Sequence, residues 1–430
     1  MIRNSLIYIL LRRICFFINI FKYLPRKYDE QYNFFRLLRS VLKNKDKYSF
    51  LFDKNNIHVI ENISNQFLRE DVLFDIIDNH YGNKSIPKIL VFSHELSLTG
   101  APKVALFLSK ILKNIYGVSP IVVSLKDGPI RKEFYSENIE ILDIAISIYN
   151  GNYIKNLVEK FDLVIVNSWC FPIMDVLAQT RTRKIWWSHD TFTQNEEFDI
   201  IKKFMPCLHE CWSGSPLTQD KLTEIYPLKK NFLMLYGLDD LYIENIKHEN
   251  IVFSVMGSIS NRKGQDVLID AIKLLSDDTL KKCQFLIIGE NIDNNLYQRI
   301  EDASRNYSMI RYYNSVPFEK LLDFYAKSDV IIIPSRYDPM PIVAIYAFMF
   351  KKICVCSDKT GTARFINNKK NGLIFESENS KELANIIKDI TWNMKNYNEI
   401  AKNGRKIYDE YFSVRMFEEN VKAKLQDILK

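Results

Sequence analysis

Two cations stand beside a glycine in SNRKGQ, residues 260–265, where a predicted strand (residues 251–258) leads into a predicted helix (residues 266–275). Arg262 offers a planar guanidinium and Lys263 a compact ammonium, and both groups are common ligands of phosphate oxygens. Gly264 allows the backbone to come close to a ligand. This spacing predicts a diphosphate site, with a solvated pair of surface charges as the alternative.

A second anion site is predicted in residues 331–350, IIIPSRYDPMPIVAIYAFMF. An apolar strand ends at Pro334, a polar loop runs through Asp338, and Pro341 suits the first position of a helix, where its missing N–H costs nothing. The helix over residues 342–350 is apolar on nearly every face, so we expect it to be buried. Its free N–H groups would favour a negative charge. An ordinary strand–helix unit is the alternative.

His189 follows the apolar strand 185–187, at the sheet edge where α/β proteins bind ligands. A histidine there can donate to a sugar hydroxyl or a phosphate, or it can be satisfied within its own loop. Gly100 lies in another strand-to-helix turn, SHELSLTGAP at residues 93–102, where a backbone can approach a ligand. An ordinary tight turn would also explain Gly100.

These residues need a scaffold of short apolar strands separated by segments of helix length, which indicates parallel sheets with helices on both faces. We expect an N-terminal half over residues 86–245 and a second half over residues 246–412, with a cleft between them. Residues 1–85 would form a helical extension, and residues 413–430 a last helix able to pack on either half. The predicted strands cover residues 87–92, 119–125, 139–144, 161–168, 184–190, 209–215, 251–258, 284–290, 309–316, 329–335 and 353–361.

The seven cysteines do not follow the spacing of a zinc site, since Cys207 with Cys211 and Cys354 with Cys356 do not form two C-x-x-C pairs. Free cysteines in a reducing cytoplasm are the simpler interpretation. The sequence contains no convincing cluster of His, Asp, Glu and Cys. We therefore expect a site that works without a metal or a resident cofactor.

Residues 1–27 carry six basic residues and no acid, which is nearly all of the formal net charge of +7. Three of the basic residues lie within the aromatic and aliphatic run SLIYILLRRICFFINIFKYL and the other three flank it, so the charge is not expected on a folded face and no nucleic-acid partner is expected. An interfacial helix on the anionic inner leaflet fits this composition. A spanning helix would place Arg12 and Arg13 near mid-bilayer, and a secretory signal would need a small-residue cleavage site. The remaining alternative is a helix that is buried against the body of the protein.

In their order and spacing, these segments resemble the family-4 glycosyltransferases of GT-B fold, in which two Rossmann-like domains face a central cleft. The resemblance covers about residues 87–425. It is carried by SHELSLTGAP, WWSHD, GSISNRKGQDVLIDAI, LIIGE, PSRYDPMPIVAIYA, SDKTG and NNKKNGLIFE. It implies metal-independent transfer of a sugar from a nucleotide-sugar donor in the cleft, with retention of anomeric configuration.

The resemblance also implies roles for single residues. Lys263 matches the lysine that holds the donor diphosphate, whereas the family's arginine position is Ser258 here and Arg262 would replace it from the other end of the loop. Asp338 matches the first acid of the E-x7-E pattern and would face the donor sugar, as would His189. The remaining predicted donor contacts are Gly100, Val316 (at the base), Met340, Pro341, Ile342 and Tyr346.

Two positions depart from the family pattern. Tyr346 replaces the second glutamate, which usually bonds ribose hydroxyls, and a tyrosine cannot make a bidentate contact. Arg364 stands where many members have an acid. The expected function is sugar transfer to a glycan or lipid-linked acceptor in bacterial surface polysaccharide synthesis (lipopolysaccharide, O-antigen or capsule). The enzyme would lie in the cytoplasm, peripheral on the inner face of the membrane.

Two alternatives to this function follow. Tyr346 suits a catalytically weak relative that binds a nucleotide sugar or a partner transferase. A different nucleotide-binding α/β protein would need a complete glycine fingerprint followed by an acid about 20 residues on, which this sequence does not contain.

Overall fold

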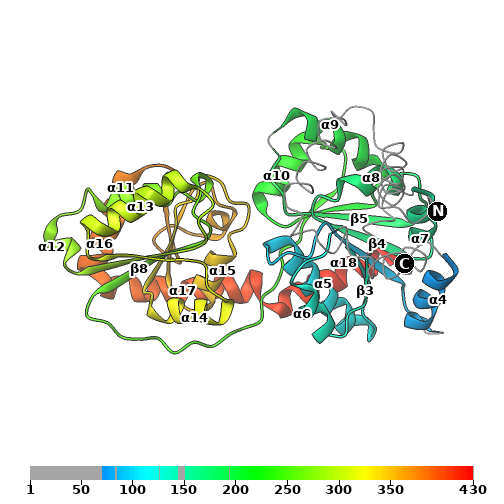
Figure 1. Ribbon diagram of the computed structural model, residues 1–430, viewed down its shortest axis with the longest axis horizontal. Coiled ribbons are helices and arrows are strands. Elements are labelled where there is room, and N and C mark those ends of the chain that lie inside the picture. Colours follow the sequence, from blue (N-terminus) through cyan, green and yellow to red (C-terminus); the bar gives the residue numbers. More distant parts are fainter. Residues whose placement is uncertain (1–69, 83–84, 125, 144–150, 193, 430) are drawn as a thin grey trace, which may run out of the picture.

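The computed structural model describes residues 70–429 apart from 83–84, 125, 144–150 and 193, and these form two halves, each built on a parallel sheet (Figure 1). The predictions for residues 1–27, and for helices before residue 70, lie outside the described residues. Helix α4 (Glu70–Tyr81) is the described part of the predicted extension.

The first sheet has seven strands in the order β3-β2-β1-β4-β5-β6-β7, and every neighbouring pair is parallel. The chain crosses from β3 over β2 and β1 to β4, so the strand order reverses beside β1, the kind of position at which α/β sheets bind ligands. The strands are β1 (Ile89–Ser93), β2 (Ile121–Ser124), β3 (Ile141–Asp143), β4 (Leu163–Asn167), β5 (Arg183–Ser188), β6 (Glu210–Ser213) and β7 (Asn231–Leu233).

Helices cover both faces of this sheet because successive residues of its strands are apolar on both sides. Ile89 and Val91 of β1 pack with α5, α6 and the C-terminal helix α18, whereas Leu90 and Phe92 pack with the helices of the other face. The helices are α5 (Gly100–Tyr116), α6 (Arg131–Ser136), α7 (Gly151–Val158), α8 (Phe171–Leu177), α9 (Asn195–Phe204), the turn η3 (Met205–Cys207) and α10 (Pro216–Ile225).

The second sheet has six parallel strands in the order β10-β9-β8-β11-β12-β13. Phe253 and Val255 of β8 pack with helices α11, α13 and α16, while Val252 and Met256 belong to the opposite face. The strands are β8 (Ile251–Met256), β9 (Cys283–Ile288), β10 (Ile310–Tyr313), β11 (Val330–Ile333), β12 (Ile353–Ser357) and β13 (Leu373–Phe375).

The helices of the second half alternate with its strands up to β13 and then follow one another to the end of the chain. They are η4 (Asn261–Lys263), α11 (Gln265–Ile272), α12 (Asp277–Leu280), α13 (Asn294–Asn306), α14 (Phe318–Lys327), α15 (Ile342–Met349), η5 (Gly361–Phe365), α16 (Ser380–Asn393), η6 (Met394–Tyr397), α17 (Asn398–Ile407), the π-helical turn η7 (Tyr408–Phe412) and α18 (Val414–Leu429).

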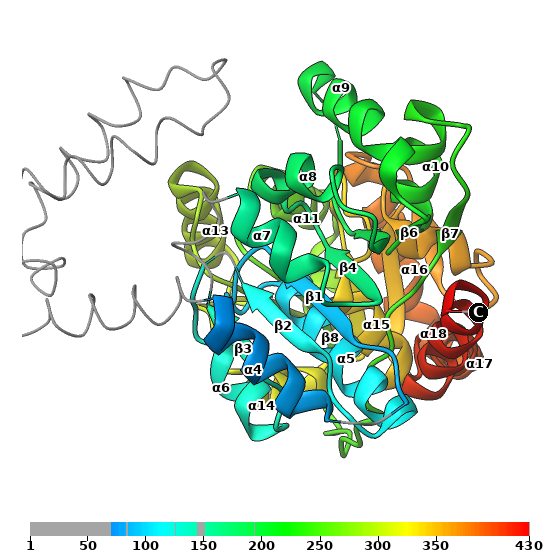
Figure 2. The ribbon, with the colours of Figure 1, turned by 90° about the vertical axis from the view of Figure 1, so that its right-hand side faces the viewer.

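The chain passes between the halves twice. The first connection follows β7, and the second follows α17, after which α18 packs on α5 of the first half (red in Figure 1). Phe417 of α18 lies against Trp187 of β5, with ring centroids 5.5 Å apart. Tyr408 donates to Leu238 O at 2.8 Å and so joins the two connections. Seen from the first half, the second lies behind it (Figure 2).

The prediction of two Rossmann-like halves is confirmed, and each predicted strand appears with ends shifted by a few residues. The strand predicted over residues 251–258 ends at Met256, because Gly257 takes φ 140° and turns the chain. Strands β7 and β13 were not predicted. Each has only three residues at the edge of a sheet, too few for a periodic pattern. Among the described residues, no helix is both long and apolar enough to cross a bilayer.

Candidate active site

A cavity of about 170 Å³ lies between the two halves. The first half contributes the start of α5 and the loops after β5, β6 and β7, and the second half contributes the loop before α15. His189, Asp338 and Gly100 therefore line one cleft, although they are far apart in sequence. The full lining is Gly100, Ala101, Val104, Phe107, His189, Asp190, Gly214, Ser215, Tyr236, Asp338, Pro339, Met340 and Ile342.

Asp338 accepts a charged hydrogen bond from Lys263, with 2.5 Å between Nζ and Oδ2. Arg262 lies 3.4 Å from the same oxygen and donates to Tyr337 O at 3.1 Å. The Arg262 side chain is 52 % exposed, whereas that of Lys263 is 18 % exposed. The structure thus brings together the two cations and the acid that the sequence predicted for the donor site.

Arg336 holds the cation loop in place. Its guanidinium makes a bidentate pair with Asp266 (2.9 and 2.7 Å) and donates to Asn261 O at 2.6 Å. Burial alone would raise the pKa of Asp266, but the Arg336 pair lowers it below its ordinary value. Gly264 takes φ 70°, and a side chain there would begin 2.1 Å from Pro334 O. The loop can approach the end of β11 only with a glycine at this position.

Helix α15 begins directly beside these charges. Its first residue is Ile342, and Pro341 is the N-cap. The sequence suggested the first helical position for Pro341, so the proline lies one position before the place expected for it. Met340 and Ile342 face the cleft, and Tyr236 of the first half donates to Met340 O at 3.2 Å. The hydroxyl of Ser335 is buried and has no hydrogen-bond partner among the described residues, and it lines a small void together with Lys263 and Pro341.

Tyr346 lies in an aromatic cluster on the inner side of α15. Its ring stacks on Phe350 at 5.8 Å and contacts Phe318 (5.3 Å) and Tyr325 (5.7 Å), and only 9 % of the residue is exposed. This packing accounts for an aromatic side chain at the position. It does not by itself provide a ribose contact.

His189 stands at the end of β5, with its ring in the protein interior and its edge on the cleft. Nε2 lies 3.0 Å from Oδ1 of Asn167, at the end of the neighbouring strand β4. Burial, and to a smaller extent the nearby His94, lowers the pKa of His189 to about 3, so the imidazole is neutral at physiological pH. Trp187 packs against the ring, with 4.7 Å between centroids.

Asp190 is a second titratable group of the cleft that the sequence-based prediction missed. Burial raises the pKa of this carboxylate, although Ser168 Oγ donates to both of its oxygens, at 3.1 and 3.0 Å. Its place directly after His189 in WWSHD was the available signal, as a strand-end acid in an α/β fold often lies in a site. Asn167, Gly214 and Tyr236 were also missed, because nothing local marks them.

The other predicted positions lie around this centre. Gly100 is the first residue of α5, and apart from its chain neighbours and its own helix backbone no atom of the described residues lies within 4 Å of the place its Cβ would take, so the cleft is open there. Val316 is half-buried in the loop between β10 and α14 and does not line the cavity. Arg364 pairs with Asp220 of α10 at 2.8 Å, which joins the two halves across the cleft.

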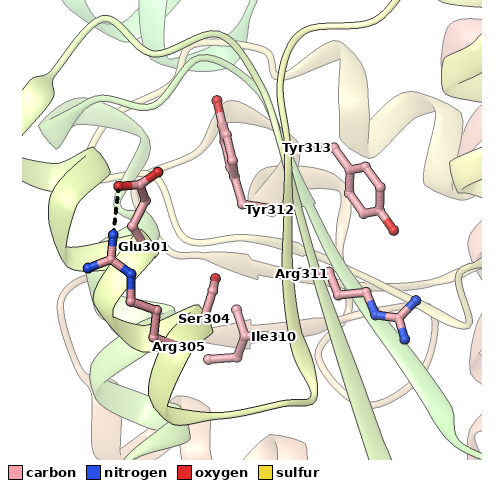
Figure 3. A pocket seen from close by; sticks show the side chains of 7 residues that line it. All are labelled: Glu301, Ser304, Arg305, Ile310, Arg311, Tyr312 and Tyr313. Carbon is pink, nitrogen blue, oxygen red and sulfur yellow. Dashed lines mark ion pairs between the residues drawn. The ribbon is translucent and has the colours of Figure 1, made fainter.

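A larger open hollow, of about 420 Å³, lies away from the cleft beside edge strand β10 (Figure 3). It holds an ion pair between Glu301 and Arg305 at 3.6 Å and contains none of the predicted site residues. Within the part of the chain that the structure describes, no group of three or more His, Cys, Asp and Glu side chains could hold a metal ion. The six described cysteines are free.

Two family models match the chain. Residues 85–215 match glycosyl-transferase family 4, and residues 240–407 match glycosyl transferases group 1, so the two regions together cover well over half of the chain. An uncharacterized glycosyltransferase of Methanocaldococcus jannaschii is 26 % identical over 187 residues, which is 43 % of this chain and 50 % of that protein. An uncharacterized 41.2 kDa protein in the cps region of Klebsiella pneumoniae is 24 % identical over 251 residues, 54 % of this chain and 63 % of that protein. The matches thus span half to about two thirds of these relatives.

Among solved structures, Anabaena HepE in complex with UDP and glucose has the same fold, with a TM-score of 0.67 at 16 % identity. The superposition covers 79 % of this chain and all of HepE. The family models, the two facing parallel sheets and the likeness in fold agree with one another. The chain belongs to the family-4 glycosyltransferases and has the GT-B fold.

Proposed function

We propose that this protein transfers a sugar from a nucleoside-diphosphate sugar to a hydroxyl of a glycan or lipid-linked acceptor, with retention of anomeric configuration. One observation carries the proposal: Lys263 and Arg262 meet Asp338, and Asp338 lines the interdomain cavity together with His189. Phosphate-binding cations and a sugar-orienting acid are the two groups that such a donor needs.

The departing nucleoside diphosphate develops negative charge, and preorganised cations and N–H groups stabilise it best where water is excluded. Lys263 is largely shielded, and the free N–H groups at the start of α15 lie beside it. Asp338 would orient the sugar through its hydroxyls, which lowers the barrier by positioning. We expect these groups to suffice without a metal ion, so transfer should survive excess EDTA. Loss of transfer in EDTA, restored by magnesium or manganese, would contradict this part of the proposal.

The donor can be identified by thermal shift, because specific binding raises the melting temperature by mass action. UDP-sugars form the first panel, since HepE was solved with UDP and glucose, and GDP- and dTDP-sugars serve as comparison. A donor that stabilises the protein is then incubated with acceptors, and NMR of the product gives the anomeric configuration. Nucleotide release without any sugar product, or no stabilisation by any panel member, would count against a transferase.

A role in surface polysaccharide synthesis is supported by the cps-region relative and by the composition of residues 1–27. Six basic residues among aromatic and aliphatic ones suit an anionic inner leaflet, at about 1 kcal/mol for each basic residue near the surface. The full chain should float with anionic vesicles and less so at high salt, while a chain starting near residue 28 should stay soluble and unbound. If the shortened chain aggregates and the full chain ignores vesicles, residues 1–27 pack on the protein.

A further inference from the structure

Asn167 connects the cleft histidine to the start of α5. It is the last residue of β4 and is completely buried. Its Nδ2 donates to Ala101 O at 2.8 Å, and its Oδ1 lies 3.0 Å from Nε2 of His189. A buried amide with both ends engaged has one orientation only, because a flipped amide would set its oxygen against the Ala101 carbonyl.

This orientation fixes where the His189 proton lies. Since Oδ1 of Asn167 is an acceptor, Nε2 of His189 must carry the hydrogen that it shares. A neutral imidazole has one N–H, and burial keeps His189 neutral by lowering its pKa to about 3. Nδ1 therefore keeps its lone pair and is a hydrogen-bond acceptor.

Gly214 is the cavity-lining residue next to Nδ1. An alanine at position 214 would place its Cβ 2.2 Å from Nδ1, so the ring can take this place at the cavity wall only beside a glycine. Both residues line the interdomain cavity. Among the described residues nothing donates to Nδ1, and Nδ1 is not one of the buried unpaired atoms, so a ligand can reach it.

We propose that Asn167 is a positioning residue that holds His189 as the Nε2–H tautomer, so that Nδ1 accepts a hydrogen bond from a sugar hydroxyl bound in the cleft. The proposal rests on the proposed function and refines it: the histidine accepts from the sugar and does not donate to a phosphate. Asn167 itself touches no reacting group and acts through His189.

The tautomer is measurable without any substrate. The chain has six histidines, so long-range ¹H–¹⁵N spectra of ¹⁵N-histidine protein can be assigned, with His189→Gln identifying the His189 signals. We expect a proton on Nε2 and none on Nδ1. His209 is an internal reference, because its Nδ1 accepts from the Lys184 N–H at 3.1 Å. A proton on Nδ1 of His189 in the wild type would overturn the proposal.

Asn167→Asp gives the kinetic test. A carboxylate beside Nε2 stabilises the imidazolium, whose Nδ1 is then protonated and cannot accept. The transfer rate of Asn167→Asp relative to wild type should fall about tenfold from about pH 8 to about pH 6. Other titratable groups also face His189 from the surrounding elements, namely His94, Asp190, Tyr236 and Asp338. Their effect on the pH dependence of the rate is present in both proteins and cancels in the ratio. A ratio that does not change with pH would contradict the assignment.

Asn231→Asp is the matched control. Asn231 also bridges two groups, accepting from Ser213 Oγ at 2.8 Å and donating to Gln219 O at 3.1 Å, but it lies outside the cleft. The Asn231→Asp substitution should change neither the His189 signals nor the pH dependence of the transfer rate relative to wild type. In Asn167→Leu, which has no acceptor, the Nε2–H preference should be lost, and an unchanged spectrum would refute the role of Asn167.

Calorimetry then shows whether the hydroxyl that donates to Nδ1 belongs to the donor sugar or to the acceptor. If donor binding to Asn167→Asp weakens at low pH, Nδ1 serves the donor sugar; if only turnover falls, it serves the acceptor. A wild type that shows the Nε2–H tautomer but transfers no sugar would refute the proposed function and leave the positioning of His189 by Asn167 in place.

Discussion

Lys263 Nζ and Asp338 Oδ2 lie 2.5 Å apart, although 75 residues separate them in the chain. The pair is largely shielded, with the Lys263 side chain 18 % and the Asp338 side chain 8 % exposed. Arg262 lies 3.4 Å from the same carboxylate oxygen, so two cations share one anion and a net positive charge remains. A diphosphate that binds here would share these cations with Asp338.

Asp338→Asn should separate phosphate binding from sugar transfer. The substitution removes the charge that competes for Lys263, so UDP should bind tighter by about threefold to tenfold. Transfer should fall by roughly 100-fold, because the neutral amide orients the sugar less well. Calorimetry with UDP and a transfer assay measure the two effects. If UDP binding is lost as well, Asp338 serves mainly to hold the cation loop.

Tyr346→Glu tests whether the family's ribose acceptor can be restored. A glutamate would be buried among Phe318, Tyr325 and Phe350, so we expect the variant to lose about 3 kcal/mol or more of folding stability and to gain no donor affinity. Tyr346→Phe keeps the packing and should retain both stability and activity. A strong loss of donor affinity in Tyr346→Phe would show that the hydroxyl binds the donor.

Gly100→Ala tests whether a substrate approaches the start of α5. Apart from the chain neighbours and the helix's own backbone, no atom of the described part of the chain lies within 4 Å of the new Cβ, and the backbone is not in a left-handed conformation, so the melting temperature should stay within a few degrees of wild type. A bound sugar or phosphate close to Gly100 would meet the methyl group, and KM should rise about tenfold. Unchanged kinetics would mean that the substrates do not use this part of the cleft.

The stability of the protein should depend on pH through His189. Its pKa is about 3 in the folded protein and about 6.5 in the unfolded chain, so between these values the unfolded chain binds more protons. The free energy of unfolding therefore falls as the pH drops below about 6.5, by up to about 2 kcal/mol at pH 5 from this residue. Denaturant unfolding at several pH values gives the slope of the free energy of unfolding against pH, and this slope should be smaller for His189→Gln than for the wild type. Equal slopes would mean that the ring is solvated in the folded state.

The sequence could predict the scaffold because buried parallel strands are continuous apolar runs, as in Val330–Ile333. It also pointed to Arg262 and Lys263, since two cations beside a glycine at a strand end are typical of a phosphate site, although a solvated charge pair has the same pattern. It could not predict which partner each side chain takes. The Lys263–Asp338 pair depends on β8 and β11 being neighbours, and the Asn167–His189 contact on β4 and β5 being neighbours.

Tyr346 shows a different limit of sequence reasoning. Its position in the family pattern predicts a donor contact, which stays a prediction, and the sequence did not predict that its ring packs in a cluster assembled from α14 and α15. Which face of a wholly apolar helix meets the ligand cannot be inferred from its periodicity, because every face is equally apolar.

Calorimetric titration of UDP into wild type, Lys263→Ala and Lys273→Ala tests the central claim most directly. Lys273 is the control, since it is half exposed on the same half of the molecule and its one ion pair with a described residue is with Asp270 at the surface. If the cleft binds the donor diphosphate, Lys263→Ala should weaken UDP binding by about 1.5–3 kcal/mol, or roughly 10- to 150-fold, and Lys273→Ala should bind as wild type does. Equal UDP affinity in all three proteins, or none in the wild type, would contradict the assignment of this cleft as the donor site.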